Sequence, residues 1–137
     1  MAEIEIELRY TIFSQLADKL AKEIDEVCET TAWRVVTAAK ISIMNPPKSG
    51  RVYQRGKRAH QASAPGESPA TDTGNLVNSA LLFKTNTADW LINWNAEYAA
   101  ALEYGTPRIL PRPFLRPAVE GQRWRFYADI AAALRLP

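Results

Sequence analysis

The pattern of apolar and polar positions predicts one long helix in the first third of the chain. Apolar side chains recur at spacings of three and four residues, which is the stripe of an amphipathic helix. The stripe consists of Phe13, Leu16, Leu20, Ile24, Val27, Thr31, Val35, Ala38 and Ile41. Asn45 and the two prolines after it end the pattern, because a residue before proline is driven out of the α region. A helix from about Ile12 to Met44 would be roughly 50 Å long, so part of it must protrude, kink or pack on a neighbour.

The segments on either side of this helix have different patterns. Residues 3–8 (EIEIEL) alternate with a period of two, which predicts a half-buried strand or an edge strand protected by its carboxylates. Residues 46–71 mix Pro, Gly, Ser and Ala with bases, and their main large apolar residues are Val52 and Tyr53. This composition predicts a long basic loop, either ordered by a partner or mobile.

The region after the loop predicts a helix followed by a hairpin. Asp72-Thr73-Gly74 offers an N-cap for a short helix over residues 75–81. Residues 82–85 and 90–95 are typical of two strands joined by a turn at 86–89. One face of the second strand would carry Trp90, Ile92 and Trp94.

The last third predicts two helices separated by an extended arm. Glu97 opens a short helix that Gly105 closes, since glycine adopts the left-handed cap most easily. Residues 106–117 contain four prolines, which favour an extended course, and Pro117 suits the first turn of a last helix. The apolar stripe of that helix would be Val119, Phe126, Tyr127, Ile130 and Leu134. We therefore expect an α+β fold: a single small domain over residues 1–137 with a long N-terminal helix, a small antiparallel sheet including a hairpin, a proline-rich extended arm and a C-terminal helix.

Composition restricts the class of protein. A chain of 137 residues that is 47% hydrophobic fits one folded domain. The sequence has no apolar stretch of about 18 residues and an acidic N-terminus, so we expect no membrane span, no secretory signal and a cytoplasmic site of synthesis. Cys28 is the only cysteine, which excludes an internal disulfide and agrees with a reducing compartment.

The charges are distributed unevenly along the chain. Residues 1–29 carry eight acidic and three basic side chains, whereas residues 30–66 carry no acid and seven bases. A molecule with two signs of charge suits head-to-tail association of identical copies, and its basic segment could face DNA phosphates. The candidate DNA or lumen contacts are Lys48, Arg51, Arg55, Lys57 and Arg58. A solvated charged loop is the alternative interpretation of the same run.

Candidate catalytic chemistry is weak. His60 is the only histidine, and a nucleophilic site would need Cys28 from a distant helix. The spacing of ligands typical of zinc and the glycine-rich loop that holds phosphates do not occur. We expect no enzyme activity, no catalytic or metal-binding residues and no cofactor. Cys28 is more simply a small buried hydrophobe, and Trp90, Trp94 and Phe114 are either core residues or aromatic interface anchors.

Two motifs in the second half resemble the HK97-type phage tail-component, or head-to-tail joining, morphogenesis family. The first runs from APGE at 64–67 to DTGNL at 72–76, with Ser79 one turn later. The second joins YAAALEYGT at 98–106 to RPFLRPA at 112–118. Two separated motifs in the right order make the resemblance fairly specific.

The resemblance implies a virion protein of a siphovirus-like phage, assembled in the host cytoplasm. Such a tail-completion or neck component forms a ring, expected to be a hexamer, around the DNA channel. Its partners would be further copies of itself, a tail tube or tail terminator protein, and a head connector or stopper protein, with non-specific DNA contact and no membrane. The residues expected at the subunit or ring interface are Tyr98, Glu103, Tyr104, Gly105, Thr106, Pro113, Phe114, Leu115, Arg116 and Pro117. The other matched positions are Thr73, Gly74, Leu76, Ser79 and Ala118, and none of the matched residues is catalytic in the family.

Local chemistry agrees with this assignment. Gly105 caps a helix, Thr106 can bond backbone groups of the turn, and the arm at 113–117 would present Phe114 to a partner at low entropic cost. Within the structural class, a head-closure stopper or the tail terminator itself is an alternative. From another class, a small DNA-binding regulator could use the basic loop.

Overall fold

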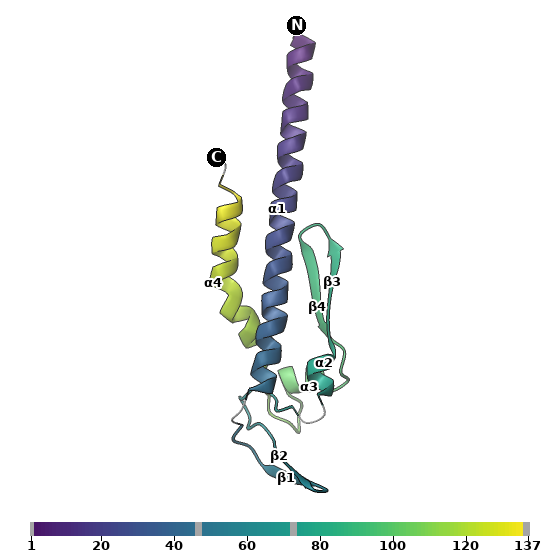
Figure 1. The fold of residues 1–137 in the computed structure, drawn as a ribbon, viewed down its shortest axis with the longest axis vertical. Helices are drawn as coiled ribbons and strands as arrows, with labels where there is room; N and C mark the ends of the chain where they lie inside the picture. The colour runs from purple at the N-terminus through teal and green to yellow at the C-terminus, as the bar shows by residue number, and fades with distance from the viewer. Residues whose placement is uncertain (1, 46–47, 72–73, 136–137) are drawn as a thin grey trace.

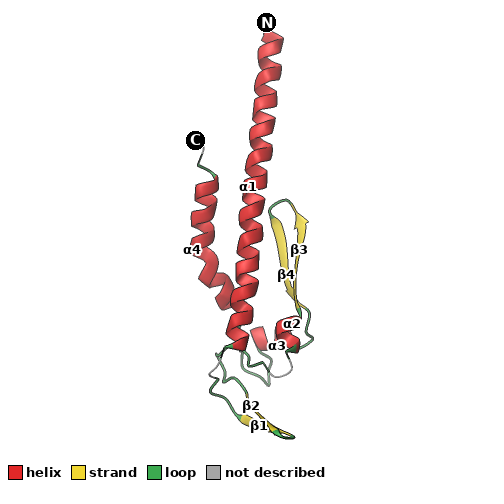
Figure 2. Ribbon diagram, in the orientation of Figure 1, coloured by secondary structure: helices red, strands yellow, loops and turns green. Residues whose placement is uncertain are grey.

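The computed structural model of the chain describes residues 2–45, 48–71 and 74–135. Along the chain its elements are α1 (Ala2–Met44), β1 (Val52–Arg55), β2 (Arg58–Gln61), α2 (Asn75–Asn78), β3 (Ala80–Asn86), β4 (Asp89–Trp94), α3 (Ala99–Tyr104) and α4 (Leu115–Ala133). The strands form two separate antiparallel hairpins, β1–β2 and β3–β4 (Figure 2). The small α+β arrangement predicted from the sequence is confirmed.

Helix α1 ends at Met44, as the Asn45-proline sequence predicts. It begins at Ala2, so the predicted strand over residues 3–8 is wrong. Glu and Leu are good helix formers, and none of the strands in the described ranges pairs with this segment. With 43 residues, α1 is about 65 Å long, and its N-terminal part extends beyond every other element (Figure 1).

The hydrophobic core surrounds the C-terminal half of α1. Its buried members are Val35, Val36, Ala39 and Ile43 from α1, Leu76 and Val77 from α2, and Trp94, Ala99, Phe114 and Ala118. Ala39, Ile43 and Phe114 are almost fully buried. The folded body is therefore built around residues 32–43, far from the N-terminus.

Helix α4 and the β3–β4 hairpin pack on opposite sides of α1 (Figure 1). Arg34 of α1 donates to Asp129 of α4 with an N–O distance of 2.8 Å. Asp25 of α1 accepts from Lys84 of β3 at 2.6 Å. Arg34 and Asp25 are nine residues apart, which is about two and a half turns of helix, so they face opposite directions.

Residues 46–71, predicted as a loop, contain the hairpin β1–β2. Val52 pairs with Gln61, and Arg55 pairs with Arg58 at the turn, where Gly56 has a φ of 61°. The apolar alternation that usually identifies a strand is absent here, because most side chains are polar and exposed. The hairpin projects from the end of the molecule opposite the N-terminus (Figure 1).

The second hairpin and its flanking helices agree closely with the prediction. β3 extends the predicted strand at both ends, β4 is shifted by one residue from the predicted 90–95, and Ala80 pairs with Trp94 at the base. Helix α2 stops at Asn78, short of the predicted residue 81, because β3 begins two residues later. Its N-cap is Gly74 without a side-chain bond, while the predicted cap residues Asp72 and Thr73 lie outside the described residues. Within the described ranges no helix has both the length and the apolar character needed to span a membrane.

Candidate assembly interface

Glu103 fixes the arm to the helix that follows it. One carboxylate oxygen accepts from the backbone N–H groups of Phe114 (2.8 Å) and Leu115 (3.0 Å), and the other accepts from Arg116 (2.8 Å). The first N–H groups of a helix have no partner within the helix, and a carboxylate there is also favoured by the helix dipole. Glu103 is buried, and its carboxylate caps the start of α4.

Gly105 ends α3 with a positive φ, as the sequence predicted, but its ψ of 174° lies outside the left-handed helical region that was expected. The Gly105 N–H donates to the Ala101 carbonyl at 2.9 Å, with a φ of 75°. The Thr106 hydroxyl accepts from the backbone N–H groups of Arg108 and Ile109. A Cβ on Gly105 would lie 2.9 Å from the Ile109 carbonyl oxygen, so the turn needs glycine for space as well as for conformation.

Phe114 is a core residue of its own subunit. Its side chain is 2% exposed and makes an edge contact with Trp94, with ring centroids 5.2 Å apart. The Trp94 indole N–H donates to the Leu76 carbonyl at 2.7 Å. The expectation that Phe114 is presented to a partner is therefore corrected: the chain folds back far enough for this ring to fill its own core.

The rest of the predicted interface divides by exposure. Tyr104 is 79% exposed, and Tyr98, Thr106, Arg116 and Pro117 are also exposed. Gly105, Pro113 and Leu115 are half-buried. The arm adds two exposed apolar side chains that the motifs did not indicate, Ile109 and Leu110. The exposed apolar surface of this region therefore consists of Tyr104 and the arm tip, Ile109 and Leu110.

Helix α4 has an outward apolar face that the sequence did not predict. Trp124 is 80% exposed and makes an edge contact with the half-exposed Tyr127, with centroids 6.1 Å apart. Tyr127 also lines a cavity with Thr31 and Val35 of α1, so it lies at the rim of the α1–α4 contact. The predicted stripe is only partly correct, because Val119, Tyr127 and Leu134 are exposed, whereas Phe126 and Ile130 are half-buried. The side of α4 that faces the core includes the small residue Ala118. The buried side is therefore rotated around the helix axis relative to the stripe of large apolar residues.

The β3–β4 hairpin has a second outward apolar face. Leu81 pairs with Asn93 and Phe83 pairs with Leu91, so these side chains share the face opposite Trp90, Ile92 and Trp94. Trp90, Ile92 and Trp94 share one face, as predicted, and this face packs toward α1. The other face leaves Leu81, Phe83 and Leu91 exposed. The sequence already indicated a second apolar face, because large apolar residues occur at both alternating sets of strand positions.

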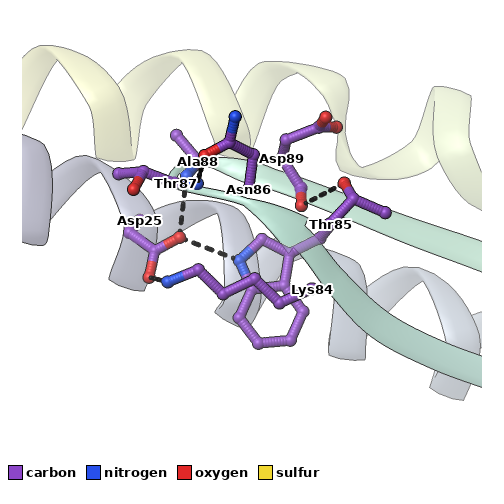
Figure 3. A network of polar contacts seen from close by, with 8 residues as sticks. Asp25, Lys84, Thr85, Asn86, Thr87, Ala88 and Asp89 are labelled. Carbon is purple, nitrogen blue, oxygen red and sulfur yellow. Dashed lines mark hydrogen bonds and ion pairs between the residues drawn. The ribbon is translucent and has the colours of Figure 1, made fainter.

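Asp25 fixes the tip of this hairpin to α1 (Figure 3). Its carboxylate accepts from the Lys84 ammonium (2.6 Å), the Ala88 N–H (2.8 Å) and the Trp90 indole N–H (3.1 Å). Ala88 has a φ of 57°, a strained value for a residue with a side chain. The hydrogen bond from Lys84, then that from Ala88, lowers the pKa of Asp25. These bonds hold the hairpin against α1, so its outward face has a fixed position relative to α1.

The predicted DNA-contacting bases separate into two groups. Arg51, Lys57 and Arg58 are exposed on or beside the β1–β2 hairpin, and the side chain of Arg55 lies outside the described part. Lys48 is half-buried and donates to the Ser42 carbonyl at 2.8 Å, which caps the C-terminus of α1. Burial lowers the pKa of Lys48, against the opposing effect of the Glu67 carboxylate. Lys48 therefore belongs to the fold and not to the exposed basic surface.

Glu67 holds the base of the β1–β2 hairpin. Its carboxylate accepts from the hydroxyl and the backbone N–H of Ser49 and from the N–H of Ala64. These bonds, that of the Ser49 hydroxyl first, lower the pKa of Glu67 to about 2. The resemblance placed Glu67 in a matched loop, and its role here is to join the two ends of the segment that carries the hairpin.

The two candidate nucleophilic groups are not brought together. Cys28 lies half-buried on α1, where burial and then the Asp25 charge raise the pKa of its thiol. His60 lies on β2 at a cavity of about 390 Å³ that Arg112, Asn75 and Tyr98 also line. Within the described ranges, no group of three or more His, Cys, Asp or Glu side chains could hold a metal ion.

The chain thus presents two outward apolar faces, an exposed arm tip and a projecting basic hairpin. Surfaces of this kind are suited to contacts with other macromolecules. No family model, curated protein or solved structure matches the chain. The resemblance to the phage head-to-tail joining family therefore stays a prediction.

Proposed function

We propose that this protein is a structural virion subunit of a tailed phage, whose copies close into a ring at the joint between tail and head. The observation that carries the proposal is the pair of apolar faces on opposite sides of α1. One face is Trp124 and Tyr127 on α4, and the other is Leu81, Phe83 and Leu91 on β3–β4. Two different faces on opposite sides favour heterologous contacts, in which one copy's α4 packs on the next copy's hairpin.

The amount of exposed surface supports a subunit that is completed by neighbours. The chain exposes 10165 Å², whereas a compact monomer of its mass would expose about 7,100 Å². The difference, about 3,000 Å², exceeds the roughly 1,600 Å² that a standard protein interface buries. The N-terminal part of α1 contributes to this excess, and lone helices are marginally stable in water. A ring in which each copy has two neighbours accounts for both features.

The motif resemblance supplies the proposed position. The ring would be a tail-completion or neck component with a tail tube or tail terminator on one side, a head connector or stopper on the other, and DNA in the lumen. A stopper or the terminator itself would have the same kind of interfaces, and the order of rings in the particle separates these alternatives. Phage particles assembled without the protein should accumulate as filled heads and free tails.

The direct test is the mass of the full-length protein in solution. Native mass spectrometry should give a ring-sized multiple of the 15.3 kDa chain. Trp124→Glu should reduce it to monomers without loss of fold, because this side chain is already exposed. Arg125→Gln is the matched control, since it makes the same change of charge on the next residue and should still assemble. A wild-type chain that stays monomeric at all concentrations would refute the proposal.

A further inference from the structure

The β1–β2 hairpin separates its side chains into a basic and a neutral face. Successive residues of a strand point to opposite faces, and directly paired residues share a face. Tyr53 pairs with His60 and Arg55 pairs with Arg58, so Tyr53, His60 and Arg58 lie on one side. The opposite face takes Val52, Gln54, Ala59 and Gln61.

Arg51 extends the basic face toward the body of the subunit. Its guanidinium carbon lies 5.6 Å from the centre of the Tyr53 ring, which places both side chains on the same side. Both are exposed, and the Tyr53 ring is not part of the hydrophobic core. The face therefore combines guanidinium groups with an accessible aromatic ring.

This positive charge has no compensating acid within the hairpin. The sequence contains no Asp or Glu from residue 30 to residue 66, and Glu67 is occupied by Ser49 and Ala64. An isolated two-stranded hairpin is already marginal in water. An anion from another molecule would therefore stabilise this element.

The basic face continues into the cavity beside it. His60 belongs to both, and Arg112 lines the cavity with an Nε atom that is buried and lacks a hydrogen-bond acceptor. A buried N–H without an acceptor is costly, and guanidinium groups suit phosphate and carboxylate oxygens. The cations thus form one surface that runs from the hairpin tip to the body.

We propose that this surface, formed by Arg51, Tyr53, Arg58 and His60, binds the phosphate backbone of nucleic acid without reading its bases. The inference rests on the proposed function, in which a ring surrounds DNA, and it names the element that contacts the DNA. Arginine with an exposed aromatic ring fits phosphates and stacked sugars or bases. The chain needs only weak, sequence-independent contact, because a passing genome must stay mobile.

Fluorescence anisotropy with a labelled mixed-sequence duplex of about 30 base pairs tests this on the full-length protein. Arg51→Gln with Arg58→Gln should raise Kd roughly tenfold and lower the slope of log K against log salt by about 2. Lys22→Gln with Arg125→Gln removes the same charge from exposed positions elsewhere and should leave Kd nearly unchanged. Equal weakening by both pairs would overturn the inference.

A charge-conserving variant tests the face itself. Arg51→Gln, Arg58→Gln, Gln54→Arg and Ala59→Arg together move two cations to the neutral face and keep the net charge. DNA affinity should stay as low as in the double variant, and recovery would refute the assignment of the face. Equally tight binding of polyglutamate would assign the surface to an acidic protein, and strong preference for one DNA sequence would indicate a regulator. The mass measurement is independent of these results, so failure of the ring and failure of the DNA contact are distinguishable.

Discussion

The two hairpins of this chain have the same topology and opposite relations to the body. β3–β4 lies along α1, with Trp94 in the core and its tip bonded to Asp25. β1–β2 projects from the end of the molecule with both of its faces largely exposed (Figure 1). The difference follows from composition, because only β3–β4 has a face of large apolar residues to bury.

The two hairpins therefore suit different roles in the proposed assembly. A hairpin that is docked on α1 can present its second face, Leu81, Phe83 and Leu91, at a fixed position. A hairpin whose base is held by Glu67 and whose strands are largely exposed can present charge to a ligand that varies in position. Fixed apolar faces suit permanent subunit contacts, whereas a projecting basic ribbon suits DNA.

The largest difference between the hairpins should be in stability. Trp94→Ala should lower the free energy of unfolding by about 3–5 kcal/mol, because it leaves a cavity beside Phe114. Tyr53→Ala should change it by less than about 0.5 kcal/mol, because that ring is exposed. Urea unfolding of both variants measures the two values. Similar losses would show that β1–β2 is packed on the body, contrary to this account.

The next largest effect should come from Glu103, which caps α4 and holds Phe114 against Trp94 of β4. Glu103→Ala should cost about 2–3 kcal/mol, since it leaves three backbone N–H groups at the start of α4 without their acceptor. Glu103→Gln keeps one acceptor oxygen and should cost about 1 kcal/mol. Thermal or urea unfolding checks both. If Glu103 instead contacts a neighbour, the monomer would lose no stability and only assembly would suffer.

Loss of Asp25 should release the tip of β3–β4 while the core stays folded. In Asp25→Asn the amide N–H of Ala88 should exchange several-fold faster, because the charged acceptor is gone. The pKa of Asp25 is lowered, so the wild-type contact is complete above the ordinary value of 3.8 and weakens as the pH falls below it. Hydrogen exchange measures this, with Asp18→Asn on the same helix as the control. Unchanged exchange at Ala88 would contradict the role of Asp25.

The smallest effect should be at the base of the projecting hairpin. The pKa of Glu67 is about 2 in the folded chain against an ordinary 4.5, so its contribution to stability is complete above 4.5 and is lost as the pH falls toward 2. Glu67→Gln should therefore show a flatter decline in unfolding midpoint across this interval than wild type. Parallel declines would show that Glu67 has no stabilising contacts.

Sequence patterns identified the elements with strong local signals and missed those that depend on distant partners. The predicted apolar stripe of α1 faces α4 at Thr31 and Val35, as expected for an amphipathic helix. A second buried side, formed by Ala32, Val36 and Ala39, was missed because small residues contribute little to hydrophobic periodicity. The β1–β2 strands were missed because their residues are mostly polar.

The candidate site could be predicted only in part, for the same physical reason. Gly105 and Thr106 act on their own turn, so local chemistry was sufficient to predict them. Glu103 acts on backbone groups eleven to thirteen residues away, a relation that spacing does not reveal. Trp124 is not part of the predicted apolar stripe of α4. A large apolar residue on the polar side of a helix was the one sequence feature that could have indicated its exposure.

The central claim is that two different apolar faces on opposite sides of the subunit pair with each other. Trp124→Glu removes the α4 face, and Phe83→Glu removes the hairpin face. The two variants can be mixed in equal amounts and the mass of the complexes measured by native mass spectrometry. Each variant alone should be monomeric, and the mixture should stop at a heterodimer, because only one α4 face and one hairpin face remain intact. A mixture that stays monomeric, or a single variant that dimerises alone through a face pairing with itself, would contradict the account.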